Sequence, residues 1–129
     1  MPLHKDVVLD RKSFQNMLED NQGFVIMKFG ATWCEPCKRI ESVVEERFNE
    51  LGKSTHVSCM TIDIDDSFDL YAFLKMKKVV KSIPAILCYV TGNPSVYPDD
   101  LVNTSDTKEV NAFFDRCKDS LLEATQPRK

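Results

Sequence analysis

The stretch Trp33-Cys34-Glu35-Pro36-Cys37-Lys38 decides the fold, because two cysteines separated by two residues follow an apolar run and open a helical pattern. At a helix start, unpaired backbone N–H groups and the positive end of the helix dipole stabilise a thiolate. Side chains three residues apart have Cβ atoms about 5–6 Å apart, close to the disulfide range of about 3.5–4.5 Å. The motif therefore predicts a cysteine pair that closes and reopens, with one thiol attacking and the other resolving.

The composition is that of one globular domain. The chain has 129 residues, 43% hydrophobic and 29% charged, with a net charge of −3. Charges of both signs are interspersed, which favours neither nucleic acid nor membrane as a partner. No secretory signal and no apolar run of about 18 residues is present, so a cytoplasmic protein is expected. We expect a domain over residues 1–125 and a loose tail over 126–129.

Apolar periodicity predicts strands and helices in the order βαβαβαββα. The strands are expected at residues 7–9, 24–30, 57–64, 83–90 and 95–97. The helices are expected at residues 11–19 after an Asp10 cap, at 34–51, at 67–76, and after an Asp106 cap to about 121. Alternating strands and helices favour parallel pairing, and a closing hairpin favours an antiparallel edge. The fold class is therefore α/β, with a mixed sheet of about five strands flanked on both faces by about four helices.

Two segments resemble the thioredoxin family. The run from Phe29 to Lys38 is similar to its active-site segment, and Ser82-Ile83-Pro84-Ala85-Ile86-Leu87 is similar to its cis-proline strand. A C-x-x-C pair alone is ambiguous, since it is also half of many zinc sites. The preceding strand, the following helix and an Ile-Pro pair about 50 residues later make the resemblance specific, and it extends from about Val7 to Leu121.

The resemblance implies a thioredoxin fold and a thiol–disulfide oxidoreductase that reduces protein disulfides. Cys34 would be the exposed nucleophile, and Cys37 the more buried resolving thiol. Trp33, Ile83 and Pro84 would bind substrate, with a cis bond before Pro84 that frees the Ile83 backbone to pair with an extended substrate chain. The implied partners are disulfide-bearing proteins and an external reductase. No cofactor is expected beyond the redox-active Cys34–Cys37 disulfide.

Two positions beneath the cysteine pair depart from the family. Lys28 stands where the family has a buried aspartate that accepts the proton of the resolving thiol, and Thr61 stands where many members have the lysine that pairs with it. One hypothesis is that a cationic Lys28, partnered by Asp63 or Asp65, lowers the pKa of the buried thiol. The alternative is that Lys28 extends to solvent and has no part in the chemistry.

Two further departures, Glu35 and Ser42, lie in and after the motif, and Pro36 between the cysteines agrees with the family. Glu35 replaces a glycine, and its carboxylate opposes a thiolate at Cys34 while favouring the helix start. Pro36 fits the first helical turn and, by family analogy, favours a reducing potential. Ser42 replaces a helix-kinking proline, so the helix over residues 34–51 is expected to be straighter.

A second function remains open, namely a thioredoxin-fold protein-interaction module with weak or no redox activity. A basic cluster that leads into Ile83-Pro84 is either an ordinary solvated face or a docking surface for an acidic partner. The cluster comprises Lys75, Lys77, Lys78 and Lys81.

The remaining cysteines are expected to be packing thiols without catalytic roles, namely Cys59, Cys88 and Cys117. Zinc binding by the C-x-x-C pair would need further ligands from His4, His56 or Cys59, and Cys59 and His56 belong to a different strand. No metal is therefore expected.

Overall fold

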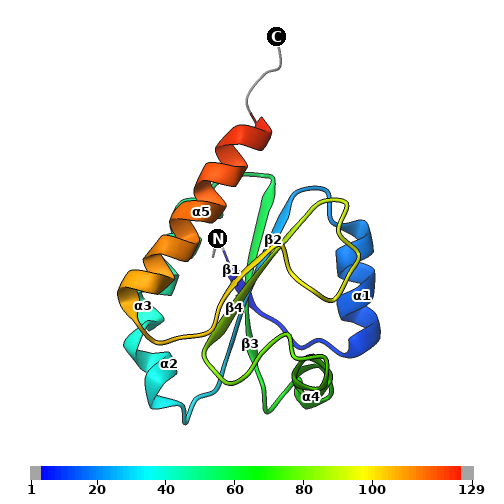
Figure 1. Ribbon diagram of the computed structural model, residues 1–129, viewed down its shortest axis with the longest axis vertical. Helices are drawn as coiled ribbons and strands as arrows, with labels where there is room; N and C mark the ends of the chain where they lie inside the picture. The colour runs from blue at the N-terminus through cyan, green and yellow to red at the C-terminus, as the bar shows by residue number, and fades with distance from the viewer. Residues whose placement is uncertain (1–3, 126–129) are drawn as a thin grey trace.

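The computed structural model describes residues 4–125, which form one sheet with helices on both faces (Figure 1). The tail expected at residues 126–129 lies outside this range. The elements, in chain order, are β1 His4–Asp6, α1 Arg11–Asp20, β2 Phe24–Gly30, α2 Glu35–Arg39, α3 Glu41–Leu51, β3 Val57–Asp63, α4 Phe68–Met76, β4 Ala85–Val90, β5 Asp100–Val102 and α5 Thr107–Thr125.

The sheet is mixed, as predicted, and its five strands lie in the order β1-β3-β2-β4-β5. Strands β1 and β2 run parallel to β3, whereas β4 is antiparallel to both β2 and β5. Phe29 pairs with Ala85 of β4, and Gly30 pairs with Asp63 of β3. The ends of β2 and β3 and the beginning of β4 therefore meet at one edge of the sheet, where the chain continues into the cysteine motif.

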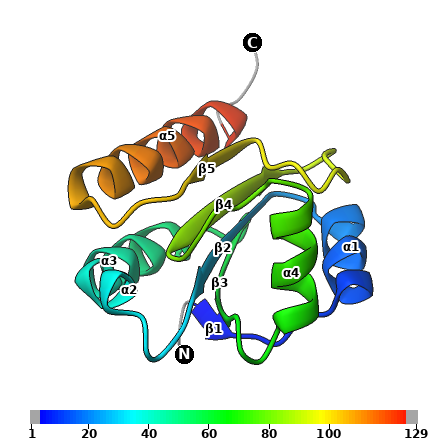
Figure 2. The same cartoon turned by 60° about the horizontal axis from the view of Figure 1, so that its bottom comes forward.

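Helices α1 and α4 cover one face of the sheet, and α3 and α5 cover the other (Figures 1 and 2). Strand β2 is buried on both sides. Val25, Met27 and Phe29 belong to the core beneath α1 and α4, whereas Phe24 and Ile26 belong to the core beneath α3 and α5. Full burial of such side chains stabilises a fold by about 1.5–3 kcal/mol each. This two-sided burial explains why β2 is nearly all apolar.

Both predicted helix caps are present. The Asp10 carboxylate accepts a hydrogen bond of 2.8 Å from the backbone N–H of Ser13 and begins α1. Asp106 accepts one of 2.9 Å from the Lys108 N–H at the start of α5. Within residues 4–125, no helix combines the length and the apolar character that crossing a membrane requires.

The two edge strands lie elsewhere than the sequence predicted. Residues 7–9 lie beyond β1: the Val7 N–H still donates to the Thr61 carbonyl of β3, but Val8 is 69% exposed and the Leu9 N–H donates to the Ser67 hydroxyl instead of to a strand. Residues 95–97 form part of a turn, in which the Ser95 N–H donates to the Asn93 side chain. Strand β5 forms later, where Leu101 lies opposite Leu87.

The predicted helix over residues 34–51 is wrong in one respect, because it consists of two helices, α2 and α3. The break is at Ile40, with φ −103° and ψ 1°, where the backbone N–H bonds to the Cys37 carbonyl three residues earlier. The expectation that Ser42 would give a straighter helix is therefore not met. This tightened turn also raises the helix count above the expected four in the described chain.

Candidate active site

The C-x-x-C pair lies where β2 leaves the sheet and α2 begins. Cys34 is the N-cap of α2 in an extended conformation, and its Sγ accepts a 3.2 Å hydrogen bond from the Cys37 backbone N–H. The two residues form a disulfide with Cα atoms 5.3 Å apart. Because α2 has only five residues, the Cys37 N–H near Sγ contributes more to stabilising a thiolate than the dipole of so short a helix does.

Neither cysteine of the disulfide is exposed. Both residues are 4% accessible, so the expectation of an exposed Cys34 above a more buried Cys37 does not hold for this oxidised form. Each sulfur covers part of the other when they are bonded. A thiolate at Cys34 can form only in the reduced protein, in which the Cys34–Cys37 bond is absent.

Trp33 precedes the pair and presents its ring to solvent, with 62% of its surface exposed. Its indole N–H donates a 2.8 Å hydrogen bond to Oδ2 of Asp65, which follows β3. The Asp65 N–H in turn donates to the Asp63 carboxylate at 2.8 Å. A large exposed ring fixed at one end suits a contact surface beside the cysteines.

The Ile83–Pro84 segment reaches the same edge of the sheet. Its peptide bond is cis, and Ala85, which follows, pairs with Phe29 on the strand that carries the chain toward Cys34. Pro84 is buried, whereas Ile83 is partly exposed. The topology thus brings the two sequence-predicted segments, 50 residues apart in the chain, to one edge.

Glu35 and Pro36 occupy the first turn of α2. Glu35 is exposed and forms an ion pair of 3.3 Å with Lys38 one turn later. Such an exposed pair contributes at most about 1 kcal/mol to stability. Pro36 lies within the first two helical positions, where a missing N–H costs no helical hydrogen bond.

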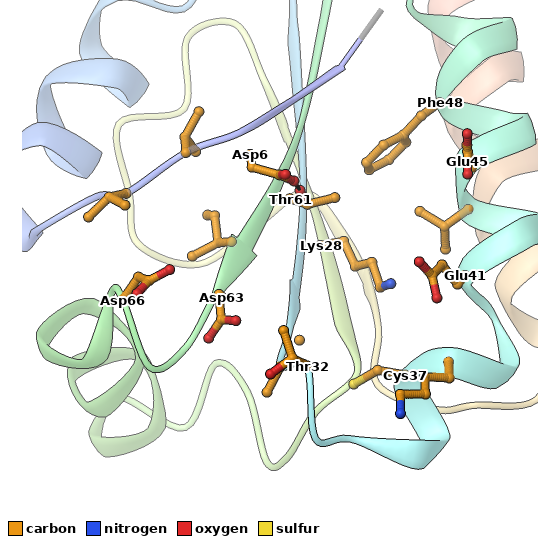
Figure 3. Close-up of a pocket in the computed structure, with 17 residues that line it drawn as sticks. Asp6, Lys28, Thr32, Cys37, Glu41, Glu45, Phe48, Thr61, Asp63 and Asp66 are labelled. Carbon is orange, nitrogen blue, oxygen red and sulfur yellow. Dashed lines mark hydrogen bonds between the residues drawn. The ribbon is translucent and has the colours of Figure 1, made fainter. Parts of the chain in front are cut away.

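Lys28 lies in β2 beneath the cysteine pair and lines a cavity of about 640 Å³. Figure 3 shows its side chain extending across the cavity toward Glu41 of α3, with Cys37 nearby. Gly30 leaves room for this arrangement: a Cβ at that position would lie 3.4 Å from the Cys37 Sγ and 3.8 Å from the Lys28 Cε. Lys28 and Cys37 thus share one small space.

Burial lowers the pKa of the Lys28 ammonium, and attraction to the Glu41 carboxylate partly opposes this shift. The sequence-based choice of Asp63 or Asp65 as its partner was wrong. Asp65 instead accepts the hydrogen bond from Trp33. Thr61 lies opposite Lys28 in the sheet, so the two positions that depart from the family are neighbours in the structure. The Thr61 hydroxyl donates a hydrogen bond to the Asp6 carboxylate.

The three other cysteines lie in the core between the sheet and α5, on the face away from α1 and α4: Cys59 in β3, Cys88 in β4 and Cys117 on α5 itself. Cys59 and Cys88 flank Ile26 in neighbouring strands, and all three cysteines are at most 5% exposed. Burial raises the pKa of Cys59 to about 12. A hydrogen bond with Cys117, and then burial, raise the pKa of Cys88. Cys59 and Cys88 therefore stay protonated at neutral pH, and burial of all three thiols limits their access to reagents.

The lysines of the basic cluster lie on the surface. Lys75, Lys77, Lys78 and Lys81 are exposed, and two of them lie over aromatic rings: Lys75 over Tyr71 and Lys77 over Phe73. Among residues 4–125, no group of three or more histidine, cysteine or acidic side chains is arranged to hold a metal ion.

Sequence reasoning missed two residues at this edge. Glu41 lies four residues after Cys37, a spacing that places both on one helical face, so a signal existed. The break at Ile40 obscures that spacing. Asn103, which follows β5, hydrogen-bonds the segment around Pro84, and no local pattern indicates this contact.

This geometry defines the class of protein. The family model described as Thioredoxin matches residues 5–116, so the chain belongs to the thioredoxin family. A mixed sheet with helices on both faces and a C-x-x-C pair at a helix start agrees with that assignment.

Several curated relatives are similar in sequence. Thioredoxin M5, chloroplastic, of Oryza sativa subsp. japonica is 31% identical over 87 residues, covering 67% of this chain and 46% of the relative. The mitochondrial thioredoxin of Bos taurus is 30% identical over 111 residues, covering 83% and 59%. Thioredoxin of Bacillus subtilis is 35% identical over 74 residues, covering 57% and 65%. The chain spans about half the length of the chloroplastic relative.

Solved thioredoxin structures share the fold. The Trichomonas vaginalis thioredoxin superposes with a TM-score of 0.70 at 19% identity, covering 91% of this chain and 99% of that one. The Plasmodium falciparum thioredoxin gives 0.65 at 23% identity, covering 87% and 97%. At these identities, the likeness shows the architecture alone.

Proposed function

We propose that this protein is a thiol–disulfide oxidoreductase that reduces protein disulfides through Cys34 and Cys37. The observation that carries the proposal is the cysteine pair at the start of α2, with the Cys37 N–H donating to the Cys34 Sγ. Membership of the thioredoxin family supports it. The reaction needs no cofactor besides this disulfide.

The proposed reaction has two exchange steps. The Cys34 thiolate attacks one sulfur of a substrate disulfide, and the other substrate sulfur leaves as a thiolate and takes up a proton. Cys37 then loses its proton and attacks the Cys34 Sγ, releasing the second substrate thiol. Two electrons pass to the substrate, and the Cys34–Cys37 disulfide remains. An external reductase supplies two electrons to reopen it.

Substrate binding is assigned to the surface beside the pair. Trp33 offers an exposed apolar ring, and cis-linked Ile83–Pro84 reaches the same sheet edge. Within the described residues, neither the N–H nor the C=O of Ile83 has a hydrogen-bond partner. These groups are therefore available to pair with an extended chain that carries the substrate disulfide.

Lys28 and Glu41 are proposed to tune Cys37. A cation beside a thiol favours the thiolate and lowers its pKa, whereas a carboxylate has the opposite effect. We expect Lys28→Met to raise the Cys37 pKa and Glu41→Gln to lower it. Thiolate absorbance in a Cys34→Ser background measures this directly, because the raised pKa values of Cys59 and Cys88 keep those thiols protonated near neutral pH. Unchanged titration curves would show that Lys28 does not affect the pKa of Cys37.

The test of the proposed function is reduction of insulin by dithiothreitol, with the reduction potential of the Cys34/Cys37 pair measured in parallel. Catalysed reduction that disappears in Cys34→Ser supports the proposal. Wild-type protein that adds nothing to dithiothreitol alone would overturn it. That result would favour an interaction module, for which the exposed lysines before Ile83 are the surface to test.

The compartment is proposed to be a reducing one, such as the cytoplasm. Relatives named as chloroplastic and mitochondrial show that thioredoxins work in more than one place. Localisation of the tagged protein in its own cells, together with the reductase that co-purifies with it, tests this assignment.

A further inference from the structure

Asn103 holds the segment that contains Ile83 and Pro84. The residue follows β5, and its side-chain amide donates to the carbonyls of Ser82 at 2.8 Å and Pro84 at 2.9 Å. Its side-chain oxygen accepts a 2.8 Å hydrogen bond from the Lys81 N–H. One carboxamide thus makes contacts with three backbone groups over four consecutive residues.

No other group in the described chain shares this task. Segment 81–84 precedes the first paired residue of β4, Ala85, so the sheet ladder does not fix it. Every hydrogen bond that its backbone makes within residues 4–125 goes to Asn103. The conformation of the segment therefore depends on a side chain about 20 residues away.

The three contacts lie on either side of Ile83. Lys81, Ser82 and Pro84 direct backbone groups toward Asn103, whereas the N–H and C=O of Ile83 have no partner in the described structure. Holding the neighbours of a residue fixes its own peptide groups without occupying them. A peptide group that is fixed in place and unpaired is preorganised to receive another chain.

We infer that Asn103 is a positioning residue that selects polypeptide disulfides over small ones, an inference that rests on the proposed reductase function. By fixing Lys81, Ser82 and Pro84, it aims the Ile83 backbone at an extended substrate chain. A small disulfide has no chain to pair with Ile83, so it reacts with Cys34 without this help. Misplacement of a binding group by about 1 Å costs up to about a hundredfold in rate.

The chain contains a matched control, Asn93. Its side chain also makes three hydrogen bonds, donating to the Tyr97 carbonyl and the Asp99 carboxylate and accepting from the Ser95 N–H. Both asparagines are partly buried. Asn93 lies beyond the end of β4 at Val90, whereas the segment held by Asn103 lies before its beginning, so the control removes an equivalent clamp far from the cysteines.

The experiment compares Asn103→Ala, Asn103→Asp, Asn93→Ala and Asn93→Asp with the wild type. Each is assayed for kcat/KM with insulin, a polypeptide substrate, and with bis(2-hydroxyethyl) disulfide, which has no peptide group. We expect both Asn103 variants to lose about ten- to a hundredfold with insulin, and less than about twofold with the small disulfide. Both Asn93 variants should keep wild-type values for both substrates.

Equal losses on both substrates, or wild-type activity in both Asn103 variants, would overturn the inference. The same holds if Asn93 variants lose as much insulin activity as Asn103 variants. Amide hydrogen exchange gives a readout that does not depend on activity: Asn103→Ala should speed exchange at Lys81, and Asn103→Asp, which keeps that acceptor, should not. If the wild type reduces neither substrate, the proposed function fails. Unchanged exchange at Lys81 in Asn103→Ala would then refute the positioning role itself.

Discussion

The five cysteines of this protein form two groups whose thiols lie in opposite surroundings, one polar and one apolar. Cys34 and Cys37 lie at a helix entrance at the edge of the sheet, with a backbone N–H near one sulfur and a half-buried lysine near the other. The other three thiols lie among apolar side chains between the sheet and α5. Burial raises the pKa of Cys59, and a hydrogen bond with Cys117 together with burial raises the pKa of Cys88.

The comparison teaches that placement sets thiol reactivity here. A thiolate needs donors or positive charge nearby, and the first group has both. The second group has only neighbours that penalise charge. These cysteines serve as small apolar side chains that fill the space between the sheet and α5.

The largest expected difference between the groups is in catalysis. Cys34→Ser should reduce insulin reduction to the rate of dithiothreitol alone, because the thiol that attacks the substrate disulfide is removed. Cys37→Ser should accumulate a mixed disulfide at Cys34, visible by mass spectrometry, because nothing resolves it. Cys117→Ala should retain nearly full activity. Loss of catalysis in Cys117→Ala without loss of folding would contradict the division into two groups.

Alkylation tests the same contrast in the unmodified protein. In the reduced native state at pH 7, iodoacetamide should modify Cys34 at least about a hundredfold faster than the three core cysteines, which react only when the structure opens. Peptide mass spectrometry after timed quenching gives the individual rates. In urea the rates should converge. Native rates for Cys88 close to that of Cys34 would show that the core thiols are not protected.

The same substitution should affect stability differently at the two sites. Cys88→Ser places a hydroxyl at a position that is 2% exposed, so the free energy of unfolding should fall by about 1–3 kcal/mol. Cys34→Ser should change it by less than about 0.5 kcal/mol, because Cys34 is an N-cap and serine is a favoured N-cap residue. Urea unfolding of the reduced proteins measures both. Equal losses would mean that the cap environment is as intolerant of a hydroxyl as the core.

Much of the fold followed from patterns that are local in the sequence. The apolar run of β2, the spacing of α1 and α5, and the two capping aspartates were each readable from nearby residues, and each lies where predicted. The positions of the edge strands were not readable from nearby residues, because an edge strand forms where it finds a partner strand. Strand β5 forms where Leu101 lies opposite Leu87, and not at residues 95–97, where the sequence favours a strand. The break at Ile40 could not be predicted, because no glycine or proline lies beside it in the sequence.

The candidate site divides in the same way. The C-x-x-C motif, Trp33 and Ile83-Pro84 were found because each carries a recognisable sequence signature. Their supporting contacts are tertiary, and the four-residue spacing of Cys37 and Glu41 was the single local signal for one of them. Glu41 meets Lys28 across a cavity, and Asn103 reaches back over about 20 residues, so neither neighbour was identified from the sequence.

The smallest expected effect concerns Lys28, whose positive charge lies near Cys34 and Cys37 and not near the three core cysteines. Lys28→Met should raise the free energy of unfolding by about 1 kcal/mol at pH 7, because it removes the desolvation of a buried ammonium. The measurement uses the oxidised protein, in which Cys34 and Cys37 do not titrate. Lys12→Met, which alters an exposed lysine of α1, is the control and should change little.

The pH dependence of the free energy of unfolding tests whether desolvation of Lys28 is the cause of that gain in stability. Burial lowers the Lys28 pKa below its ordinary 10.5, so the folded protein holds this proton more weakly than the unfolded chain does. Below the lowered pKa both states are charged, and the folded state carries the full desolvation cost. Between the lowered pKa and 10.5, the folded state becomes neutral first and the cost fades. The advantage of Lys28→Met should therefore be largest near neutral pH and shrink toward pH 10.5. A loss of stability in Lys28→Met would mean instead that attraction to Glu41 outweighs burial.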